Sequence, residues 1–130
     1  ELYFSMLRIR MVEEKMAEAY SEQEMRCPVH LSIGQEAVPT GVCAHLDDSD
    51  FVLGTHRSHH HCIAKGVDLN EMMAELFGKA TGTCGGKGGS MHVADFSLNM
   101  LGANGIVVLD PEESVLEGDE ATVQIISRIL

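Results

Sequence analysis

Residues 55–61 read THRSHHH and place one arginine and four histidines within seven positions. The glycine-rich segment 82–92 (GTCGGKGGSMH) and the segment 101–107 (LGANGIV) follow along the chain. Glycines let backbone N–H groups approach a ligand without side-chain obstruction. Clustered amides beside an arginine and several histidines are the donors that a phosphate or diphosphate requires. We therefore interpret the three segments together as an anion pocket.

Other interpretations of these segments remain open. Histidine imidazoles and the thiol of Cys62 are ligands that zinc accepts, so the run could hold a structural metal. It could also be a polar loop whose histidines cap strands or meet water, with Arg57 in a surface ion pair. The segment 85–90 (GGKGGS) does not fit the phosphate-loop pattern GxxxxGK(S/T), and a flexible linker is its alternative. The arginine and the position after an expected strand favour the anion pocket.

Composition limits the class of protein. With 130 residues, of which 45% are hydrophobic, the chain can form one domain with a modest core. A formal net charge of -11 without a basic stripe argues against nucleic acid and anionic membranes as partners. The four cysteines form no CxxC pair, and no apolar run reaches the roughly 18 residues that span a bilayer. We therefore expect a cytoplasmic protein with free thiols.

Helices and one strand are expected to position the histidine and glycine segments. Apolar residues at three- and four-residue steps predict an amphipathic helix over about residues 6–25. Ser32 and Gln35 stand at the capping-box spacing and predict a second helix through about Leu46. The segment FVLG (51–54) is short, apolar and bounded by turn residues, which predicts a buried strand that ends just before the histidine run.

A third helix is predicted after Asp68, which is a preferred N-cap residue and has Glu71 at the reciprocal position. The expected buried face of this helix consists of Leu69, Met72, Met73, Leu76 and Phe77. Glycines come too densely between 78 and 105 for regular structure, which predicts a long functional loop. In the final part of the chain we expect a short strand near 114–116 and a helix over about 120–130.

Five segments, in this order, carry a family resemblance. They are HLSIGQEAV (30–38), THRSHHHCIAKG (55–66), MMAELFGKATG (72–82), GGKGGSMH (85–92) and LGANGIV (101–107). They resemble the alpha subunit of thiamine-diphosphate-dependent 2-oxo acid and acetoin dehydrogenases. The sequences LFGKATG and GGKGGSMH are most similar to the acetoin and bacterial pyruvate dehydrogenase branches. The resemblance implies an α/β fold class, as an incomplete thiamine-diphosphate-binding fold with a helix-rich N-terminal part and few short strands.

The resemblance also divides the chain. We expect a single partial domain over residues 1–130, in which residues 6–107 resemble the dehydrogenase alpha subunit and residues 108–130 form an acidic, divergent tail. The opening ELYFS (1–5) resembles the remnant of a protease-cleavage tag and is set aside from functional reasoning.

In the family that this chain resembles, the residues matching His56 and Arg57 hold the diphosphate of thiamine diphosphate. The residue matching His59 lies near the reacting centre, which makes His59 the candidate catalytic residue. Backbone groups matching Gly105 and Val107 contact the aminopyrimidine ring. The residue types suit these roles, because arginine offers a fixed fork of donors to phosphate oxygens and glycine permits close approach to a flat ring.

The chain departs from the family pattern at the diphosphate loop and at the metal motif. Ser58 and His60 stand where the family usually has glycine. The family continues to a GDG motif whose aspartate binds magnesium, and then to an asparagine ligand. Here Asp119 is the candidate metal ligand and the matching asparagine is not found in these 130 residues, so we expect an incomplete Mg²⁺ site in this sequence.

The resemblance implies an oxidoreductase that uses thiamine diphosphate and magnesium for the oxidative decarboxylation or cleavage of a small 2-oxo acid or acetoin. The expected partners are a beta subunit and a second alpha chain in a heterotetramer, and the acyltransferase core of the complex. Two alternatives remain open. The first is a non-catalytic assembly or regulatory fragment of that complex, and the second is a His/Cys metal-binding protein.

Overall fold

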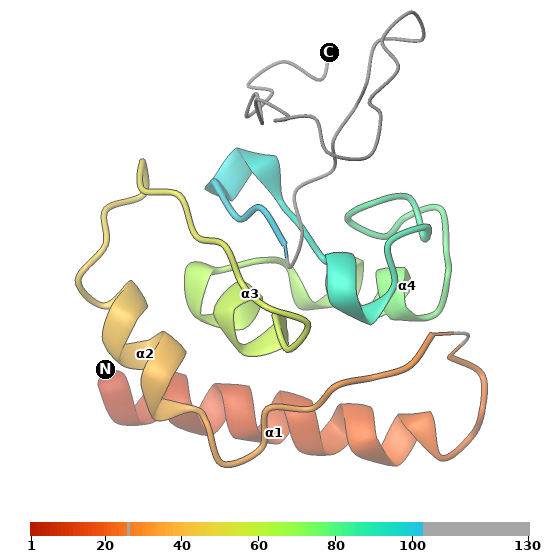
Figure 1. Ribbon diagram of the computed structural model, residues 1–130. Helices are drawn as coiled ribbons and strands as arrows, with labels where there is room; N and C mark the ends of the chain where they lie inside the picture. Colours follow the sequence, from red (N-terminus) through yellow and green to blue (C-terminus); the bar gives the residue numbers. More distant parts are fainter. Residues whose placement is uncertain (26, 103–130) are drawn as a thin grey trace, which may run out of the picture.

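A computed structural model describes residues 1–25 and 27–102. In chain order its elements are α1 (Leu2–Tyr20), α2 (Ala37–Cys43), α3 (His59–Lys65), α4 (Leu69–Leu76) and the 3-10 turns η1 (Ser90–His92) and η2 (Phe96–Leu98). The long helix α1 runs along one side of the molecule, and α2 and α3 pack against it and against each other (Figure 1). The described part of the chain is helix-rich, as the sequence predicts.

Helix α1 buries the apolar stripe that the sequence predicts. Ile9 and Met16 on this stripe are fully buried. The helix ends at Tyr20, earlier than predicted, and the turn after it includes Gln23, whose φ of 60° is incompatible with a right-handed helix. The helix also begins at Leu2, so the opening segment ELYFS contributes to its first turn.

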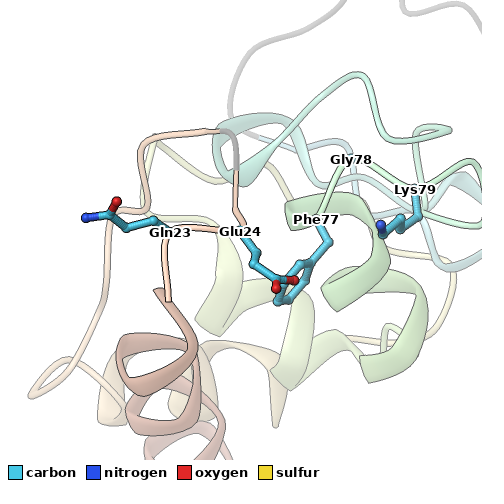
Figure 2. Close-up of a pocket in the computed structure, with 5 residues that line it drawn as sticks. All are labelled: Gln23, Glu24, Phe77, Gly78 and Lys79. Atoms are coloured by element: carbon cyan, nitrogen blue, oxygen red, sulfur yellow. The ribbon is translucent and has the colours of Figure 1, made fainter. Parts of the chain in front are cut away.

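A surface pocket of about 410 Å³ lies between the turn after α1 and the end of α4. Gln23 and Glu24 line one side, and Phe77, Gly78 and Lys79 line the other (Figure 2). The pocket wall therefore carries one carboxylate and one ammonium group. None of the site residues predicted from the sequence lines it.

The second predicted helix is shorter than expected. Helix α2 begins at Ala37, because Gly34 has a φ of 93° and turns the chain before it. The hydroxyl of Ser32 has no hydrogen-bond partner among the described residues. The backbone N–H of Ser32 instead donates to Glu13 Oε2 at 2.9 Å. The predicted capping box is therefore wrong, because a contact with α1 uses the residue that was expected to cap the helix.

An ion pair joins α1 to the start of α2. Arg10 Nε donates to Glu36 Oε1 at 2.6 Å, and the backbone N–H of Gly34 donates to the same oxygen at 2.9 Å. These two hydrogen bonds, with that of Arg10 the stronger, lower the pKa of Glu36 to about 2. Glu36 is therefore ionised at neutral pH and holds the two helices together.

The histidine run forms a helix rather than a loop. Helix α3 begins at His59 and buries His59, His60 and Ile63. It ends at Gly66, whose φ of 99° is the left-handed conformation that commonly terminates helices. A helix this short is unstable in isolation, so its packing against α1 and α2 must stabilise it. Local sequence could not predict it for that reason.

The third predicted helix is confirmed as α4. Asp68 Oδ1 accepts the backbone N–H groups of Asn70 at 2.8 Å and Glu71 at 3.1 Å, which is the predicted N-cap. Met72 and Leu76 are buried on the predicted face. Capping and apolar periodicity agree here, and the local prediction therefore succeeds.

The predicted strand forms a short parallel contact with a segment that lies far along the chain. The N–H of Val52 donates to Asn99 O at 2.9 Å, and the N–H of Leu101 donates to Val52 O at 2.9 Å. The N–H of Gly54 continues the pairing to Gly102 O at 3.0 Å. Val52 is buried as predicted, but Phe51 and Leu53 are exposed and no strand forms at 51–54, so the predicted buried strand is reduced to this bridge. The pairing fixes the chain just before α3.

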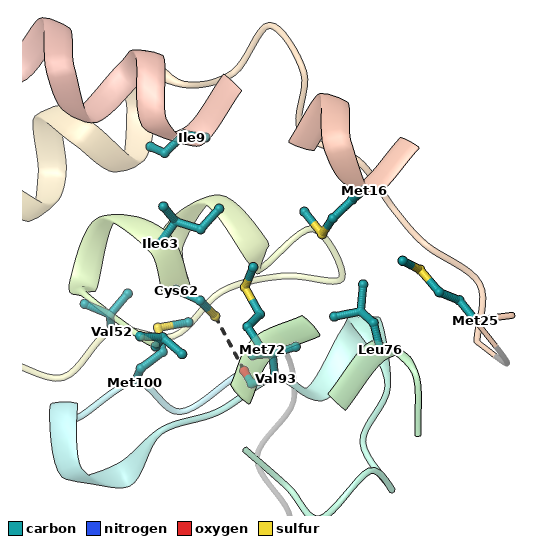
Figure 3. Packing of buried hydrophobic residues seen from close by; sticks show 11 residues of the cluster. Ile9, Met16, Met25, Val52, Cys62, Ile63, Met72, Leu76, Val93 and Met100 are labelled. Atoms are coloured by element: carbon teal, nitrogen blue, oxygen red, sulfur yellow. Dashed lines mark hydrogen bonds between the residues drawn. The ribbon is translucent and has the colours of Figure 1, made fainter. Parts of the chain in front are cut away.

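One hydrophobic core joins α1, α3, α4 and the parallel contact. Its buried members are Ile9, Met16, Met25, Val52, Cys62, Ile63, Val67, Met72, Leu76, Val93 and Met100. Figure 3 places Cys62 at the centre of this packing, where its Sγ donates to Val93 O at 3.7 Å. Burial raises the pKa of the Cys62 thiol to about 12, so this thiol is a core group at neutral pH.

The predicted loop between 78 and 105 is described as far as residue 102. It contains η1, η2 and the bridged residues Asp95 and Met100, and no longer helix or strand is assigned between 78 and 102. The predicted strand near 114–116 and the predicted helix over 120–130 lie outside the described residues. Of the helices described, none combines the length and the apolar character that crossing a bilayer requires.

Candidate functional site

Two of the residues predicted to bind diphosphate lie exposed at the surface. The ring of His30 meets the ring of His56 edge-on, with centroids 4.9 Å apart and an interplanar angle of 90°. Arg57 Nε donates to the backbone oxygen of Leu31 at 3.1 Å. These contacts bring two imidazoles and one guanidinium together, and we call the group of His30, His56 and Arg57 the imidazole–arginine face.

His59, the predicted catalytic residue, lies inside the protein at the first position of α3. Its Nε2 is hydrogen-bonded to Ser90 Oγ at 2.8 Å, and its Nδ1 lies 3.5 Å from Glu13 Oε1. The exposed fractions of Glu13, His59 and Ser90 are 0%, 0% and 1%. A carboxylate, an imidazole and a hydroxyl from three separate segments therefore meet in the interior.

The same buried groups also bind the segment that carries His30. Glu13 Oε2 accepts the backbone N–H of Ser32 at 2.9 Å. Ser90 Oγ lies 3.4 Å from the backbone nitrogen of His30, which donates to it. The buried groups and the imidazole–arginine face are therefore connected through the backbone of residues 30–32.

The other histidines of the run do not form a metal cluster. His60 and His61 pack ring against ring, with centroids 4.2 Å apart. Burial lowers the pKa of His60 to about 4, with a smaller contribution from His61, and burial lowers the pKa of His61 as well. Successive residues of a helix point in directions about 100° apart, so a run within α3 cannot converge on one ion. Within residues 1–25 and 27–102, no three His, Cys, Asp or Glu side chains are arranged as metal ligands.

The glycine-rich segment folds around a carboxylate of the protein itself. Glu75 lies in α4 and is 1% exposed. Its Oε2 accepts the backbone N–H groups of Cys84 at 2.7 Å and Gly86 at 2.8 Å. Its Oε1 accepts those of Gly88 at 2.6 Å and Gly89 at 3.2 Å. Four amides therefore converge on one buried carboxyl group.

This contact corrects two interpretations of the glycine-rich segment. Its amides bind Glu75, so they are not free donors for a phosphate, and this part of the predicted anion pocket is wrong. The flexible-linker interpretation is wrong as well, because four hydrogen bonds hold the segment to one side chain. Of the described residues, the imidazole–arginine face remains as the candidate anion site.

Close approach explains why glycines are needed in this segment. A Cβ on Gly82 would lie 2.5 Å from Glu75 Oε2. A Cβ on Gly86, which has a φ of 74°, would lie 2.5 Å from the carbonyl carbon of Gly78. The glycines therefore serve the wrapping of the loop around Glu75 and the end of α4.

Three predicted site residues cannot be placed against this geometry. Gly105 and Val107, predicted to contact the aminopyrimidine ring, and Asp119, predicted to bind the metal, lie outside the described residues. The described residues place His56 and Arg57 at the surface and His59 in the interior.

Sequence reasoning missed Glu13 and Glu75, although the position of each on an apolar helix face could have identified it. Glu13 lies on the buried stripe of α1 between Ile9 and Met16, and Glu75 lies on the buried face of α4. A carboxylate on an apolar stripe needs internal donors, because burial without them is very costly. Ser90 was missed too, and its place in a glycine-rich segment gives no comparable signal.

Comparison with known proteins decides the family. Residues 4–124 match the family described as Dehydrogenase E1 component. This chain belongs to that family. The resemblance drawn from the five sequence segments is therefore confirmed.

Curated members of the dehydrogenase E1 family are similar to this chain over most of its length. The alpha subunit of acetoin:2,6-dichlorophenolindophenol oxidoreductase from Bacillus subtilis is 59% identical over 106 residues, and that from Cupriavidus necator is 49% identical over 106 residues. Each of these alignments covers 82% of this chain and 32% of the relative. Subunit alpha-3 of the chloroplastic pyruvate dehydrogenase E1 component from Oryza sativa subsp. japonica is 48% identical over 102 residues, which are 78% of this chain and 24% of the relative. The chain thus spans a third or less of the length of these relatives.

Proposed function

We propose that this chain is part of the alpha subunit of a thiamine-diphosphate-dependent dehydrogenase that oxidatively decarboxylates or cleaves a small 2-oxo acid or acetoin. The match of residues 4–124 to the dehydrogenase E1 family carries this proposal. The relatives named as acetoin oxidoreductase and pyruvate dehydrogenase alpha subunits support the substrate class. The complete fold would be a thiamine-diphosphate-binding α/β fold, of which the described residues form a helix-rich part.

The imidazole–arginine face suits the diphosphate of the cofactor. Within the described residues Arg57 donates only through Nε, so its terminal nitrogens remain available as a fork of donors to phosphate oxygens. His56 is exposed beside it and offers a further donor. On the same proposal, the backbone groups of Gly105 and Val107 would contact the aminopyrimidine ring.

Bound thiamine diphosphate would supply the electron sink that cleavage next to a carbonyl carbon requires. The residues of this chain would bind and orient the cofactor. His59 is fully buried, so we propose that it acts from beneath the site and that His30 and His56 are the imidazoles at the ligand.

Magnesium would neutralise the diphosphate. Asp119 is the carboxylate that we assign to it, and the remaining oxygen ligands would come from the diphosphate, from water or from other chains. We further propose a cytoplasmic heterotetramer with beta subunits and a second alpha chain, bound to the acyltransferase core of the complex.

Titration calorimetry tests the cofactor proposal. Thiamine diphosphate with magnesium is titrated into the purified chain, alone and together with a beta subunit, and the titrations are repeated with Arg57→Ala. Loss of the guanidinium should weaken binding about tenfold or more, because charge-assisted hydrogen bonds to phosphate are lost. Arg8→Ala on α1 is the matched control and should leave the affinity unchanged. No binding heat in any of these mixtures would contradict the proposal.

A non-catalytic assembly or regulatory role in the same complex is the second candidate function. Exposed apolar side chains on α1 and α2 favour it, namely Leu7, Met11, Val38 and Val42. Contiguous exposed apolar surface commonly marks an interaction site. Retention of a beta subunit in a pull-down, combined with no cofactor heat, would favour this role over catalysis.

A further inference from the structure

We propose that Glu13, His59 and Ser90 form a buried positioning clamp that holds residues 30–32 and thereby sets the ring of His30 against His56 at the imidazole–arginine face. The inference rests on the proposed function for its purpose, which is to present that face to the cofactor. Its geometry is independent of any ligand. The clamp assigns a positioning role to His59 and to two residues that the sequence did not single out.

The clamp acts on residues 30–32 from two sides. Glu13 Oε2 accepts the N–H of Ser32 at 2.9 Å, and Ser90 Oγ accepts the N–H of His30 at 3.4 Å. His59 joins the two, since its Nε2 is 2.8 Å from Ser90 Oγ and its Nδ1 is 3.5 Å from Glu13 Oε1. Both ends of the segment are therefore fixed by one connected group of buried side chains.

Counting donors and acceptors gives the tautomer of His59. The oxygen of Ser90 accepts the N–H of His30, so the Ser90 hydroxyl proton needs an acceptor of its own. His59 Nε2 at 2.8 Å is the acceptor in reach, and it must then carry no proton. The proton of His59 is therefore on Nδ1, which faces Glu13 Oε1 at 3.5 Å, a contact too long to count as a hydrogen bond. The opposite tautomer would leave a buried hydroxyl proton without an acceptor, which is unfavourable.

The same carboxylate–imidazole–hydroxyl order occurs in hydrolases that use serine as a nucleophile. Here the exposed fraction of Ser90 is 1%, and its oxygen already accepts a backbone N–H. A substrate carbonyl cannot reach this hydroxyl in the described structure. The three side chains therefore act by holding the backbone rather than by attacking a bond.

Nuclear magnetic resonance of the free chain tests the clamp directly. With ¹⁵N-labelled histidine at about pH 8, where an ordinary imidazole is neutral, the nitrogen shifts of His59 should show a protonated Nδ1 and an unprotonated Nε2. A nuclear Overhauser contact between the rings of His30 and His56 should be present. A His59 protonated on Nε2 would overturn the proposal without the use of any variant.

Variants separate positioning from simple core packing. In Glu13→Gln, the amide cannot present an acceptor both to the N–H of Ser32 and to the Nδ1–H of His59. Either the tautomer of His59 should invert, or residues 30–32 should shift and the ring contact should be lost, while the fold remains. In Ser90→Ala, the contact between His30 and His56 should be lost, since His30 loses its backbone anchor. Ser32→Ala is the matched control, because the Ser32 side chain is buried but its hydroxyl has no partner among the described residues. It should change neither signal.

The outcomes keep this inference distinct from the proposed function. A folded Ser90→Ala or Glu13→Gln variant with an unchanged His59 tautomer and an unchanged ring contact would overturn the clamp. The cofactor titrations would be unaffected by that result, because they depend on Arg57. Conversely, absence of cofactor binding would leave the clamp measurements standing, since they use the free chain.

Discussion

Glu75 lies inside the glycine-rich loop that follows it, and the backbone N–H of Gly88 donates to its carboxylate at 2.6 Å. Three further N–H groups of the same loop complete the coordination. A segment that looks like a binding loop for an external phosphate therefore binds an internal carboxylate. The same loop carries Ser90, whose hydroxyl contacts His59. The conformation of the loop and the geometry of the buried clamp therefore both depend on Glu75.

Replacing Glu75 with glutamine should lower the free energy of unfolding by about 2–4 kcal/mol, because part of the carboxylate becomes an NH₂ group that faces N–H donors. Urea denaturation of the variant and the parent chain measures this difference. Glu71→Gln is the control, since Glu71 lies exposed on the same helix and its substitution should change stability by less than about 0.5 kcal/mol. Equal effects of the two substitutions would contradict the role assigned to Glu75.

Gly86→Ala should destabilise the chain more than Gly85→Ala. Both glycines have a positive φ, 74° and 64°, so both alanines incur a backbone penalty of about 1 kcal/mol. A Cβ on Gly86 would also lie 2.5 Å from the carbonyl carbon of Gly78, whereas a Cβ on Gly85 would meet no atom within 4 Å. Thermal denaturation of the two variants compares them under one set of conditions. Identical midpoints would mean that the close approach at Gly86 is relieved at no cost.

Acidification should destabilise the fold in two steps. The pKa of His60 is lowered from 6.5 to about 4, and burial lowers the pKa of His61 as well, so the unfolded chain takes up these protons first and stability falls as the pH drops below about 6.5. The pKa of Glu36 is lowered from 4.5 to about 2, so its contribution is complete above about pH 4.5 and is lost as the pH falls toward 2. Chemical denaturation at a series of pH values measures both steps.

Two variants assign these steps. His60→Gln should reduce the slope of stability against pH in the upper range, and Glu36→Gln should reduce it in the lower range. His45→Gln is the control for the first, because His45 is exposed. A pH profile of the His60 variant that matches the parent profile in the upper range would show that this histidine is not held neutral by burial.

The thiol of Cys62 should resist alkylation in the folded chain. Its exposed fraction is 0%, and burial raises its pKa to about 12, so at pH 8 only about one thiol in ten thousand would be ionised. Mass spectrometry after iodoacetamide treatment should show Cys62 unmodified under conditions that modify it in urea. Rapid modification of Cys62 without denaturant would mean that the core opens readily at α3.

Local sequence was sufficient wherever local interactions determine the structure. The apolar stripe of α1 and the Asp68 cap of α4 were predictable, because periodicity and capping act between residues close together in the chain. The start of α2 was not predictable, since the backbone of Ser32 binds Glu13 on another helix. The helix at the histidine run was also missed, because its stability comes from packing on α1 and α2.

The sequence by itself determined the family, through five ordered segments, and the residue types that suit a diphosphate, His56 and Arg57. Only the tertiary structure decided that the glycine amides bind Glu75 and that His59 is enclosed between Glu13 and Ser90. The physical reason is that a buried polar group must find its partners within the fold. Those partners lie on segments that are distant in the chain. Local sequence patterns do not predict which of these segments come into contact.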